Sequence, residues 1–378
     1  MRILLTTDTI GGVWTFTKEL TAELLQRGHA VALVSLGRQP SHEQQAWCAA
    51  QNLAYGPSFQ FTASNVPLEW MEKNEFVFTQ GAGVLFHVAN RFRPDLLHSN
   101  QFCFGAVSLD IPKLVTAHGD VLSWASACRP QGIEKSRWLR QYQSLVMHGL
   151  HACDAVASPT RWMALELARH YNDLPPSYVI RNGRSLEPPE SRLRSLQAVT
   201  VGRLSDEAKN IEMLRDVNAP LPIYVAGERQ CGTSAAPRQI GRSILLGELP
   251  QSSLLTLLAR SSIYIATPIY EPFGIAPLEA ALCGCAVIAN DIPSLREVWG
   301  DDALYFDGPR SLSMLLHQLN RDERRLAEAR QRSFARANEL TAQRMADGYE
   351  ALYTTLLANH RGVRPAYVQQ PGFAAHAA

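Results

Sequence analysis

The segment of this chain whose residues are best suited to carry out chemistry begins at Glu271 and ends at Glu279. Seven residues separate these two glutamates. The segment reads Glu-Pro-Phe-Gly-Ile-Ala-Pro-Leu-Glu and follows a short apolar run, Ile263–Ala266. Pro277 suits the first position of a helix, which would put Glu279 in the first helical turn. There its carboxylate could accept hydrogen bonds from a ribose diol. The amides of residues 273–275 would point at a ligand above the helix, and Glu271 could reach a sugar from the loop.

Each glutamate also has a simpler interpretation. Glu279 could do no more than stabilise the dipole of its own helix, and Glu271 could be a solvated loop charge. A third interpretation is a glycosidase carboxylate pair, which would need the two side chains about 5–10 Å apart across a sugar.

Two cations follow a second apolar run in the same half of the chain. Arg203 comes directly after Ala198–Val201, and Lys209 precedes a helix-like segment. Arginine offers phosphate a bidentate fork, whereas lysine offers a point charge. A pair of solvated surface cations is the alternative, but their place at the end of a strand favours a diphosphate clamp.

The first half of the chain contributes a glycine pair and a histidine. Gly11 and Gly12 follow the first apolar run, where glycine lets the backbone approach a phosphate at a helix N-terminus. A tight turn without a ligand is the alternative. His118 follows the run Leu114–Ala117 and could hydrogen-bond a sugar hydroxyl or a phosphate oxygen, or it could be a structural histidine satisfied by the backbone.

The elements that would position these residues are strands alternating with helices. Apolar residues recur at spacings of three and four between the strands, as at Val13, Phe16, Leu20 and Leu24. This alternation predicts parallel sheets covered by helices on both faces, with ligands bound beyond the carboxyl ends of the strands. In the first half, the predicted strands are Ile3–Thr7, Val31–Ser35, Asp95–His98, Leu114–Ala117, Ala155–Ser158 and Tyr178–Arg181.

The pattern restarts near residue 197, which predicts an α/β fold of two doubly wound, Rossmann-like domains over residues 1–184 and 185–344. Residues 184–196, with two prolines and three arginines, form the expected linker. Charged helices are expected at about 311–338 and 340–360, a capping box at Ser294–Glu297, and a weakly structured tail at 363–378. The strands predicted in this half are Ala198–Val201, Ile223–Ala226, Ser243–Leu246, Ile263–Ala266, Ala286–Ala289 and Leu304–Phe306, and the helical stretches include Ile211–Val217 and Ser252–Ala259.

The composition excludes several classes of function. The net charge of +1 provides no strong field for nucleic acid, so an anionic substrate must be held by local groups. The seven dispersed cysteines show neither a CxxC pair nor a zinc spacing, and no Asp-x-Asp motif is present, so no metal site is expected. Free thiols, the lack of a long apolar run and a strand-like N-terminus favour a cytoplasmic location.

A basic and aromatic helix raises one alternative to a purely cytoplasmic protein. Arg137, Trp138, Arg140 and Tyr142 lie close together and could touch an anionic acceptor or the inner face of a membrane. An ordinary surface helix explains the same residues. The sequence leaves the oligomeric state open.

Taken together, these motifs resemble the retaining GT-B glycosyltransferases of family 4 (GT4), and the resemblance covers nearly the whole chain. The glutamate–seven–glutamate segment is its most specific part. The order of the glycine pair, His118, Asn182-Gly183, Gly202-Arg203 and Lys209 supports it. The chain departs from the common pattern at Arg181–Ser185, where proline usually precedes Asn-Gly and an aspartate follows soon after.

The resemblance implies a role for each of these residues. Arg203 and Lys209 would hold the nucleotide diphosphate, and Glu279 the ribose hydroxyls. Glu271, with the amides of Phe273, Gly274 and Ile275, would contact the donor sugar and phosphate. Gly11, Gly12 and His118 would come from the first domain, on which the acceptor docks and to which residues 345–362 return.

The implied activity is transfer of a sugar from a UDP- or GDP-sugar to a hydroxyl of a glycan, lipid or small metabolite, with no cofactor or metal. Two other functions stay open. A nucleotide-sugar epimerase of the same fold would use similar carboxylates, and a non-catalytic protein would bind the nucleotide-sugar without turnover.

Overall fold

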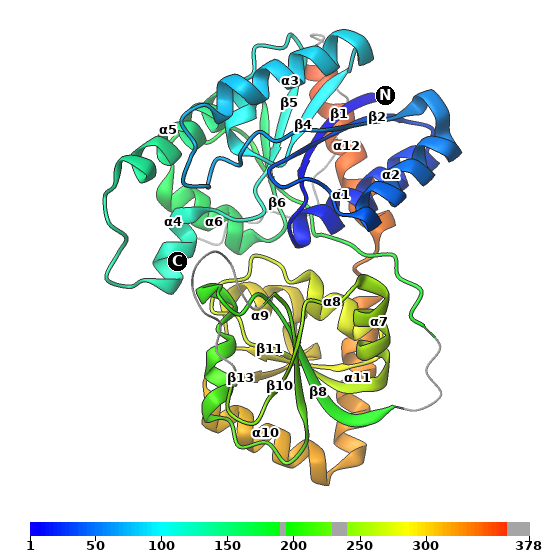
Figure 1. Ribbon diagram of the computed structural model, residues 1–378, viewed down its shortest axis with the longest axis vertical. Helices are drawn as coiled ribbons and strands as arrows, with labels where there is room; N and C mark the ends of the chain where they lie inside the picture. Colours follow the sequence, from blue (N-terminus) through cyan, green and yellow to red (C-terminus); the bar gives the residue numbers. More distant parts are fainter. Residues whose placement is uncertain (190–193, 229–239, 361–378) are drawn as a thin grey trace, which may run out of the picture.

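The computed structural model describes residues 1–189, 194–228 and 240–360. Two all-parallel sheets stand one above the other in Figure 1, the first built from the N-terminal half of the chain and the second from the C-terminal half. This confirms the predicted α/β architecture. The predicted tail at 363–378, part of the linker and Cys231 lie outside the described residues.

The first sheet has the strand order β3-β2-β1-β4-β5-β6-β7. Its strands are β1 (Arg2–Asp8), β2 (Ala30–Leu36), β3 (Phe59–Ala63), β4 (Leu96–Ser99), β5 (Lys113–Thr116), β6 (Ala155–Ser158) and β7 (Ser177–Val179). The associated helices are α1 (Gly12–Gln26), α2 (His42–Tyr55), α3 (Val77–Phe92), α4 (Val121–Cys128), α5 (Arg137–Ala152) and α6 (Arg161–His170), with short 3-10 turns η1 (Gly56–Ser58) and η2 (Phe102–Ala106).

The second sheet repeats the plan with the order β10-β9-β8-β11-β12-β13. Its strands are β8 (Ser195–Val201), β9 (Ile223–Ala226), β10 (Ile244–Gly247), β11 (Ser261–Ala266), β12 (Ala286–Asn290) and β13 (Leu304–Phe306). Its helices are α7 (Gln251–Arg260), α8 (Ile275–Leu282), α9 (Pro293–Trp299), α10 (Pro309–Arg321) and α11 (Glu323–Ala337), with 3-10 turns η3 (Glu207–Lys209), η4 (Ile211–Asp216) and η5 (Gly300–Asp302).

The central strands form because helices cover both faces of each sheet, which selects nearly continuous apolar runs. In β1 and β11 every residue but Arg2 is buried. The edge strand β3 was not among the predicted strands, because its partly exposed, alternating residues give no continuous apolar run.

Three local predictions were wrong. The expected helix 311–338 is two helices, because the Asp322 side chain accepts a hydrogen bond from the amide of Arg325 (2.9 Å) and starts a new one. The segment at 211–217 is the 3-10 turn η4 and not an α-helix. Ser294 forms no capping box, since α9 starts at Pro293 without a side-chain cap.

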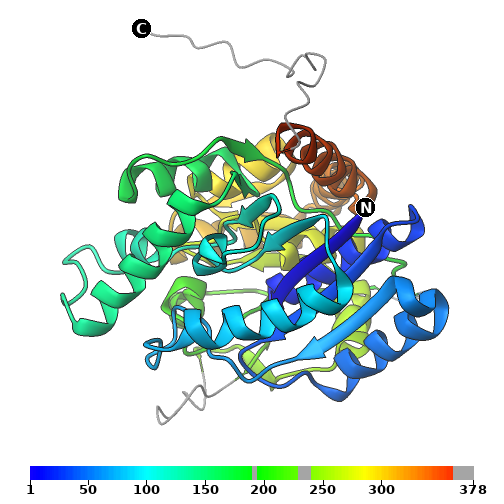
Figure 2. The same cartoon turned by 90° about the horizontal axis from the view of Figure 1, so that it is seen from above.

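The last helix, α12 (Ala342–His360), leaves the second sheet and returns to the first. Tyr349 and Tyr353 are fully buried within the core around β1, β2 and α1. The Tyr353 hydroxyl lies 2.6 Å from Nδ1 of His98 on β4. Figures 1 and 2 both show α12 alongside the first sheet, so the chain crosses between the halves twice. No helix in the described part of the chain is long and apolar enough to cross a membrane.

A close backbone contact fixes α5 against η2. A Cβ atom at Gly149 would overlap the carbonyl oxygen of Phe102, so the helix can approach this closely only with glycine. We expect Gly149→Ala to lower the free energy of unfolding by about 1–3 kcal/mol, the usual cost of overpacking. Thermal or urea unfolding measures this loss.

Gly83→Ala on α3 is the matched control. A Cβ atom there has no atom within 4 Å, and alanine favours a helix by up to about 1 kcal/mol over glycine. This variant should be unchanged or slightly stabilised. Equal stability of the two variants would contradict the proposed contact.

Candidate active site

The predicted residues converge where the strand order of each sheet reverses. β1 lies between β2 and β4, and β8 lies between β9 and β11. Such a switch point opens a crevice beyond the carboxyl ends of the strands. Gly12 follows β1, and a Cβ atom at this position would lie 3.5 Å from Cδ1 of Ile275 in the second half. The structure therefore brings the glycine pair against the Glu271–Glu279 segment.

Gly11 sets the start of α1. Its φ of 68° lies in the left-handed region that favours glycine, and no side chain caps the helix. The first amides of α1 are thus left without a side-chain acceptor, which suits them to an anion.

Asp8, which the sequence analysis missed, stands at the carboxyl end of β1. Its Oδ1 accepts a hydrogen bond from the amide of Ile10 (2.8 Å). Burial raises the pKa of Asp8 to about 6, against lowering by this hydrogen bond and by the positive charge of Arg203. The charge of Arg203, in the second half, therefore influences the ionisation of a carboxyl group at the end of β1.

The two predicted cations each have a carboxylate partner. Nη2 of Arg203 lies 2.7 Å from Oδ2 of Asp206, and this arginine is 41% exposed. Nζ of Lys209 lies 2.7 Å from Oε2 of Glu271. The structure thus brings together Lys209 and Glu271, two residues predicted separately, and both cations are accessible to an incoming anion.

Glu271 sits on a loop that is tied to the first half of the molecule on both sides. The hydroxyl of Tyr270 accepts a hydrogen bond from the amide of Asp120 (3.0 Å) and lies 2.9 Å from Oγ of Ser123. The carbonyl oxygen of Pro272 accepts a hydrogen bond from Thr160 (2.9 Å). The position of Glu271 therefore depends on both halves.

The residue expected to complete the capping box also has a partner in the other half of the molecule. The carboxylate of Glu297 accepts hydrogen bonds from the amides of Arg161 (2.7 Å) and Trp162 (2.8 Å), the first two residues of α6. It therefore caps a helix of the other half. A further ion pair, Arg129–Glu207 at 2.8 Å, joins the two halves nearby.

Glu279 lies further along its helix than predicted. Gly274, with a φ of 89°, precedes the first helical residue, so α8 begins at Ile275 and Pro277 is its third residue. Glu279 consequently falls beyond the first turn. It is 6% exposed, and its Oε1 accepts hydrogen bonds from Nε of Arg184 (2.9 Å) and Nε2 of Gln251 (3.2 Å).

The tautomer of His118 follows from its neighbours. Both hydrogens of the Asn100 amide are used, one on the carbonyl oxygen of Thr6 (2.7 Å) and one on Oγ1 of Thr17 (3.2 Å). Asn100 Oδ1 must therefore accept the proton of His118 Nε2, at 2.8 Å. Burial lowers the pKa of His118 to about 3, so the ring is neutral and Nδ1 is an acceptor. A side chain, not the backbone, thus holds this histidine.

The aromatic residues of the basic helix α5 turn inward. The Tyr142 hydroxyl donates a hydrogen bond to Oδ1 of Asp120 (2.8 Å), and the Trp138 indole donates one to the carbonyl oxygen of Met71 (2.7 Å). The exposed residues at the start of α5 are Arg137 and Arg140. The surface at this end of α5 is therefore basic, without an exposed aromatic side chain from Trp138 or Tyr142.

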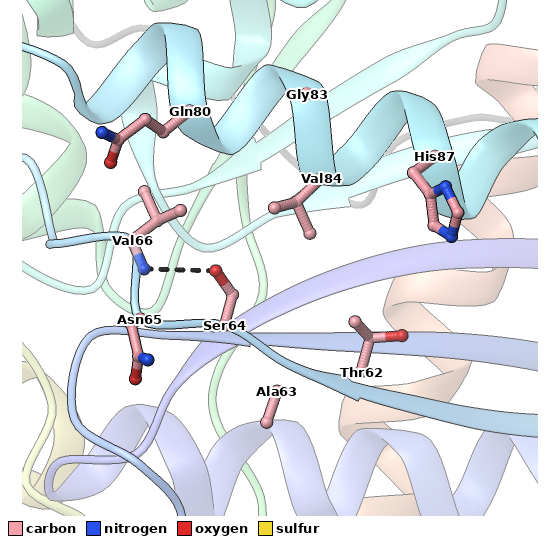
Figure 3. A pocket seen from close by; sticks show the side chains of 9 residues that line it. All are labelled: Thr62, Ala63, Ser64, Asn65, Val66, Gln80, Gly83, Val84 and His87. Atoms are coloured by element: carbon pink, nitrogen blue, oxygen red, sulfur yellow. Dashed lines mark hydrogen bonds between the residues drawn. The ribbon is translucent and has the colours of Figure 1, made fainter.

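A broad hollow of about 630 Å³ lies away from these residues, between α3 and the edge strand β3 (Figure 3). Its lining includes Ser64, Asn65, Gln80 and His87, and none of the predicted site residues. Among the described residues, no cluster of three or more His, Cys, Asp or Glu side chains could hold a metal ion.

The two facing parallel sheets, the double crossover and the returning helix define the GT-B fold. Solved structures share it over nearly the whole chain. Sucrose-phosphate synthase from Thermosynechococcus elongatus matches with a TM-score of 0.73 at 16% identity, over 95% of this chain and all of that one. Anabaena HepE, in complex with UDP and glucose, matches with a TM-score of 0.68 at 12% identity, over 94% of this chain and 99% of that one.

The family follows from the sequence match. Residues 10–187 match the Glycosyltransferase Family 4 model and residues 187–336 the Glycosyl transferases group 1 model. The chain belongs to glycosyltransferase family 4, which confirms the resemblance.

Two curated relatives are enzymes of Mycobacterium tuberculosis. Alpha-maltose-1-phosphate synthase is 26% identical over 229 residues, 52% of this chain and 58% of that enzyme, so the match spans little more than half of its length. Glycogen synthase is 24% identical over 323 residues, 76% of each chain.

The raised pKa of Asp8 predicts a pH-dependent stability. Because the folded pKa of about 6 exceeds the ordinary 3.8, the folded state binds the proton more tightly. The stabilisation is complete below 3.8 and is lost as the pH rises through 6. Asp8→Asn keeps the acceptor for Ile10 without the charge. We expect it to raise the free energy of unfolding by up to about 3 kcal/mol near neutral pH.

Urea unfolding near pH 7.5 and near pH 4.5 measures this effect. The gain in the free energy of unfolding should be smaller at the lower pH, because Asp8 is then protonated in the folded protein and carries no charge. Asp216→Asn, at an exposed position of η4, is the control and should show no gain at either pH. A gain from Asp8→Asn that is equal at both pH values would contradict the assignment.

Proposed function

We propose that this chain is a retaining glycosyltransferase that moves a sugar from a UDP- or GDP-sugar to a hydroxyl acceptor without a metal ion. The observation that carries the proposal is the Lys209–Glu271 ion pair at the start of a segment whose Ile275 meets Gly12 at the uncapped start of α1. Family membership, and a GT-B structure described with UDP and glucose, support it.

The proposed chemistry depends on charge that is already in place. Negative charge grows on the leaving diphosphate as the glycosyl bond breaks, and preorganised donors stabilise it. Arg203, Lys209 and the first amides of α1 would supply these donors. A diphosphate would compete for Lys209 and release Glu271, which lies 2.7 Å from it, towards the donor sugar.

His118 would position the sugar and not transfer a proton. Its ring is neutral because its pKa is lowered to about 3, and Nδ1 can accept a hydrogen bond from a sugar hydroxyl. We place the acceptor's attack on the same face as the departing phosphate, whose oxygen takes the acceptor's proton. No enzyme nucleophile is needed, and a glycosyl adduct trapped on Glu271 would overturn this version.

A thermal-shift screen of nucleotide-sugars tests the donor class. A ligand at 100 times its Kd adds about 2.7 kcal/mol to stability, so the true donor should raise the melting temperature clearly. The donor that binds is then incubated with glycans, lipids and small hydroxyl compounds, and the anomeric configuration of the product is read by NMR. Inversion would refute retention. Turnover without an acceptor would indicate an epimerase, and binding without turnover across a wide acceptor panel would indicate a non-catalytic protein.

Removing either cation should impair catalysis. We expect Lys209→Ala and Arg203→Ala each to lower turnover by roughly 10²–10³, the effect of losing one charge-stabilising donor. Initial rates with saturating donor measure this. Near-normal rates in both variants would refute the clamp.

Arg215→Ala is the matched control, because Arg215 forms an exposed pair with Glu212 (2.7 Å) on η4. It should keep full turnover.

The unchanged protein should keep its turnover rate when a chelator is added to the same assay. A loss of rate that magnesium or manganese restores would contradict metal independence.

A further inference from the structure

Arg184 is a buried arginine in the connection from β7 to β8. Its side chain is 4% exposed. Its amide donates a hydrogen bond to the carbonyl oxygen of Leu340 (3.0 Å), in the connection by which the chain returns to the first half. A Cβ atom at the preceding Gly183 would overlap the carbonyl oxygen of Thr341. The backbone of Arg184 is therefore fixed where the two crossovers touch.

The guanidinium of Arg184 holds a carboxylate from each half of the molecule. Its Nε donates to Oε1 of Glu279 on α8 (2.9 Å), and its Nη1 donates to Oε1 of Glu19 on α1. The second oxygen of Glu19 accepts a hydrogen bond from the amide of Ser185 (2.9 Å). Both glutamates are buried. Lys18 is half-buried beside this group. Burial and the positive charge of Arg184 lower the pKa of Lys18, against raising by the charges of both glutamates.

The contacts of Glu279 are one-sided. Arg184 and Gln251 both donate to Oε1. Oε2 has no hydrogen-bond partner among the residues that the structure describes. Two donors on one oxygen fix the rotation of a carboxylate and leave the other oxygen as an acceptor of defined direction. A loosely held carboxylate would lose conformational entropy on binding a diol, and this one has already lost it.

We infer that Arg184 is a positioning residue for the donor site: it orients Glu279 for the ribose diol and links that carboxylate to α1 of the facing half. This inference rests on the proposed function and on the ribose role that the family resemblance implies for Glu279. Arg184 lies within Arg181–Ser185, the segment where the chain departs from the common family pattern.

The two contacts of Arg184 have separable consequences. Loss of the guanidinium frees Glu279 and should weaken recognition of the ribose hydroxyls. Loss of Glu19 alone leaves Glu279 held by Arg184 and Gln251 but unlinks α1, whose first amides face the phosphate in the proposed mechanism. The first change should therefore affect ribose recognition, and the second should affect turnover.

The test compares binding of UDP or GDP, whichever the unchanged protein binds, with binding of its 2′,3′-dideoxy analogue by calorimetry. We expect the unchanged protein to prefer the ribonucleotide by about tenfold or more, the usual value of a hydrogen bond to a charged group. Arg184→Met should reduce this preference to about twofold or less. A merely structural arginine would change both affinities in parallel and leave their ratio intact.

Two further variants keep the test interpretable if Arg184→Met does not fold. Arg184→Lys keeps the charge but lacks the fork, so it should also lose most of the preference. Glu19→Gln should keep the preference and lower kcat by about tenfold. Glu166→Gln is the control for Glu19→Gln, because Glu166 is an equally buried, arginine-paired glutamate on α6, and it should change neither quantity.

The outcomes distinguish this inference from the proposed function. If the unchanged protein binds both nucleotides equally, the ribose role of Glu279 is wrong. If it prefers the ribonucleotide and the Arg184 variants keep that preference in full, only the positioning role is wrong.

Discussion

The structure depends on one constraint of parallel sheets: each strand must be followed by a crossover that starts at its carboxyl end. In both halves this places loops and helix starts at the same edge, and the two edges face each other. The uncapped start of α1 and the Lys209–Glu271 pair lie at these edges, where the crossovers that follow the strands begin. The site is therefore a property of two sheets, and neither sheet holds a complete set of donors.

Three arginine and lysine side chains of the candidate site form ion pairs. Arg203 has Asp206, Lys209 has Glu271, and Arg184 has Glu19 and Glu279. The first two pairs are partly exposed and of the kind worth little in water. They can open for an anion at low cost. The third is buried, where removing one partner is costly, so it is suited to stay closed while the others exchange partners.

The sequence predicted well what local pattern controls. Buried strands have apolar runs, so most strands and the edge that carries the site were found. Short-range pattern failed where a distant partner decided the outcome. Glu297 suits a capping box but binds the start of α6, more than a hundred positions away along the chain. The contact between Arg184 and Glu279 joins residues 95 positions apart. The helix α8 starts earlier than predicted because the conformation of Gly274, and not Pro277, determines its first residue.

Asp8, at the carboxyl end of β1, would make ligand binding depend on the pH of the solution. The positive charge of Arg203 lowers the pKa of Asp8, which burial holds at about 6. A diphosphate held by Arg203 would cancel that attraction and add its own negative charge, so the pKa of Asp8 would rise further. The protein would then take up a proton as the donor arrives. The heat of binding near neutral pH would consequently vary with the ionisation enthalpy of the buffer, and affinity would increase as the solution becomes more acidic.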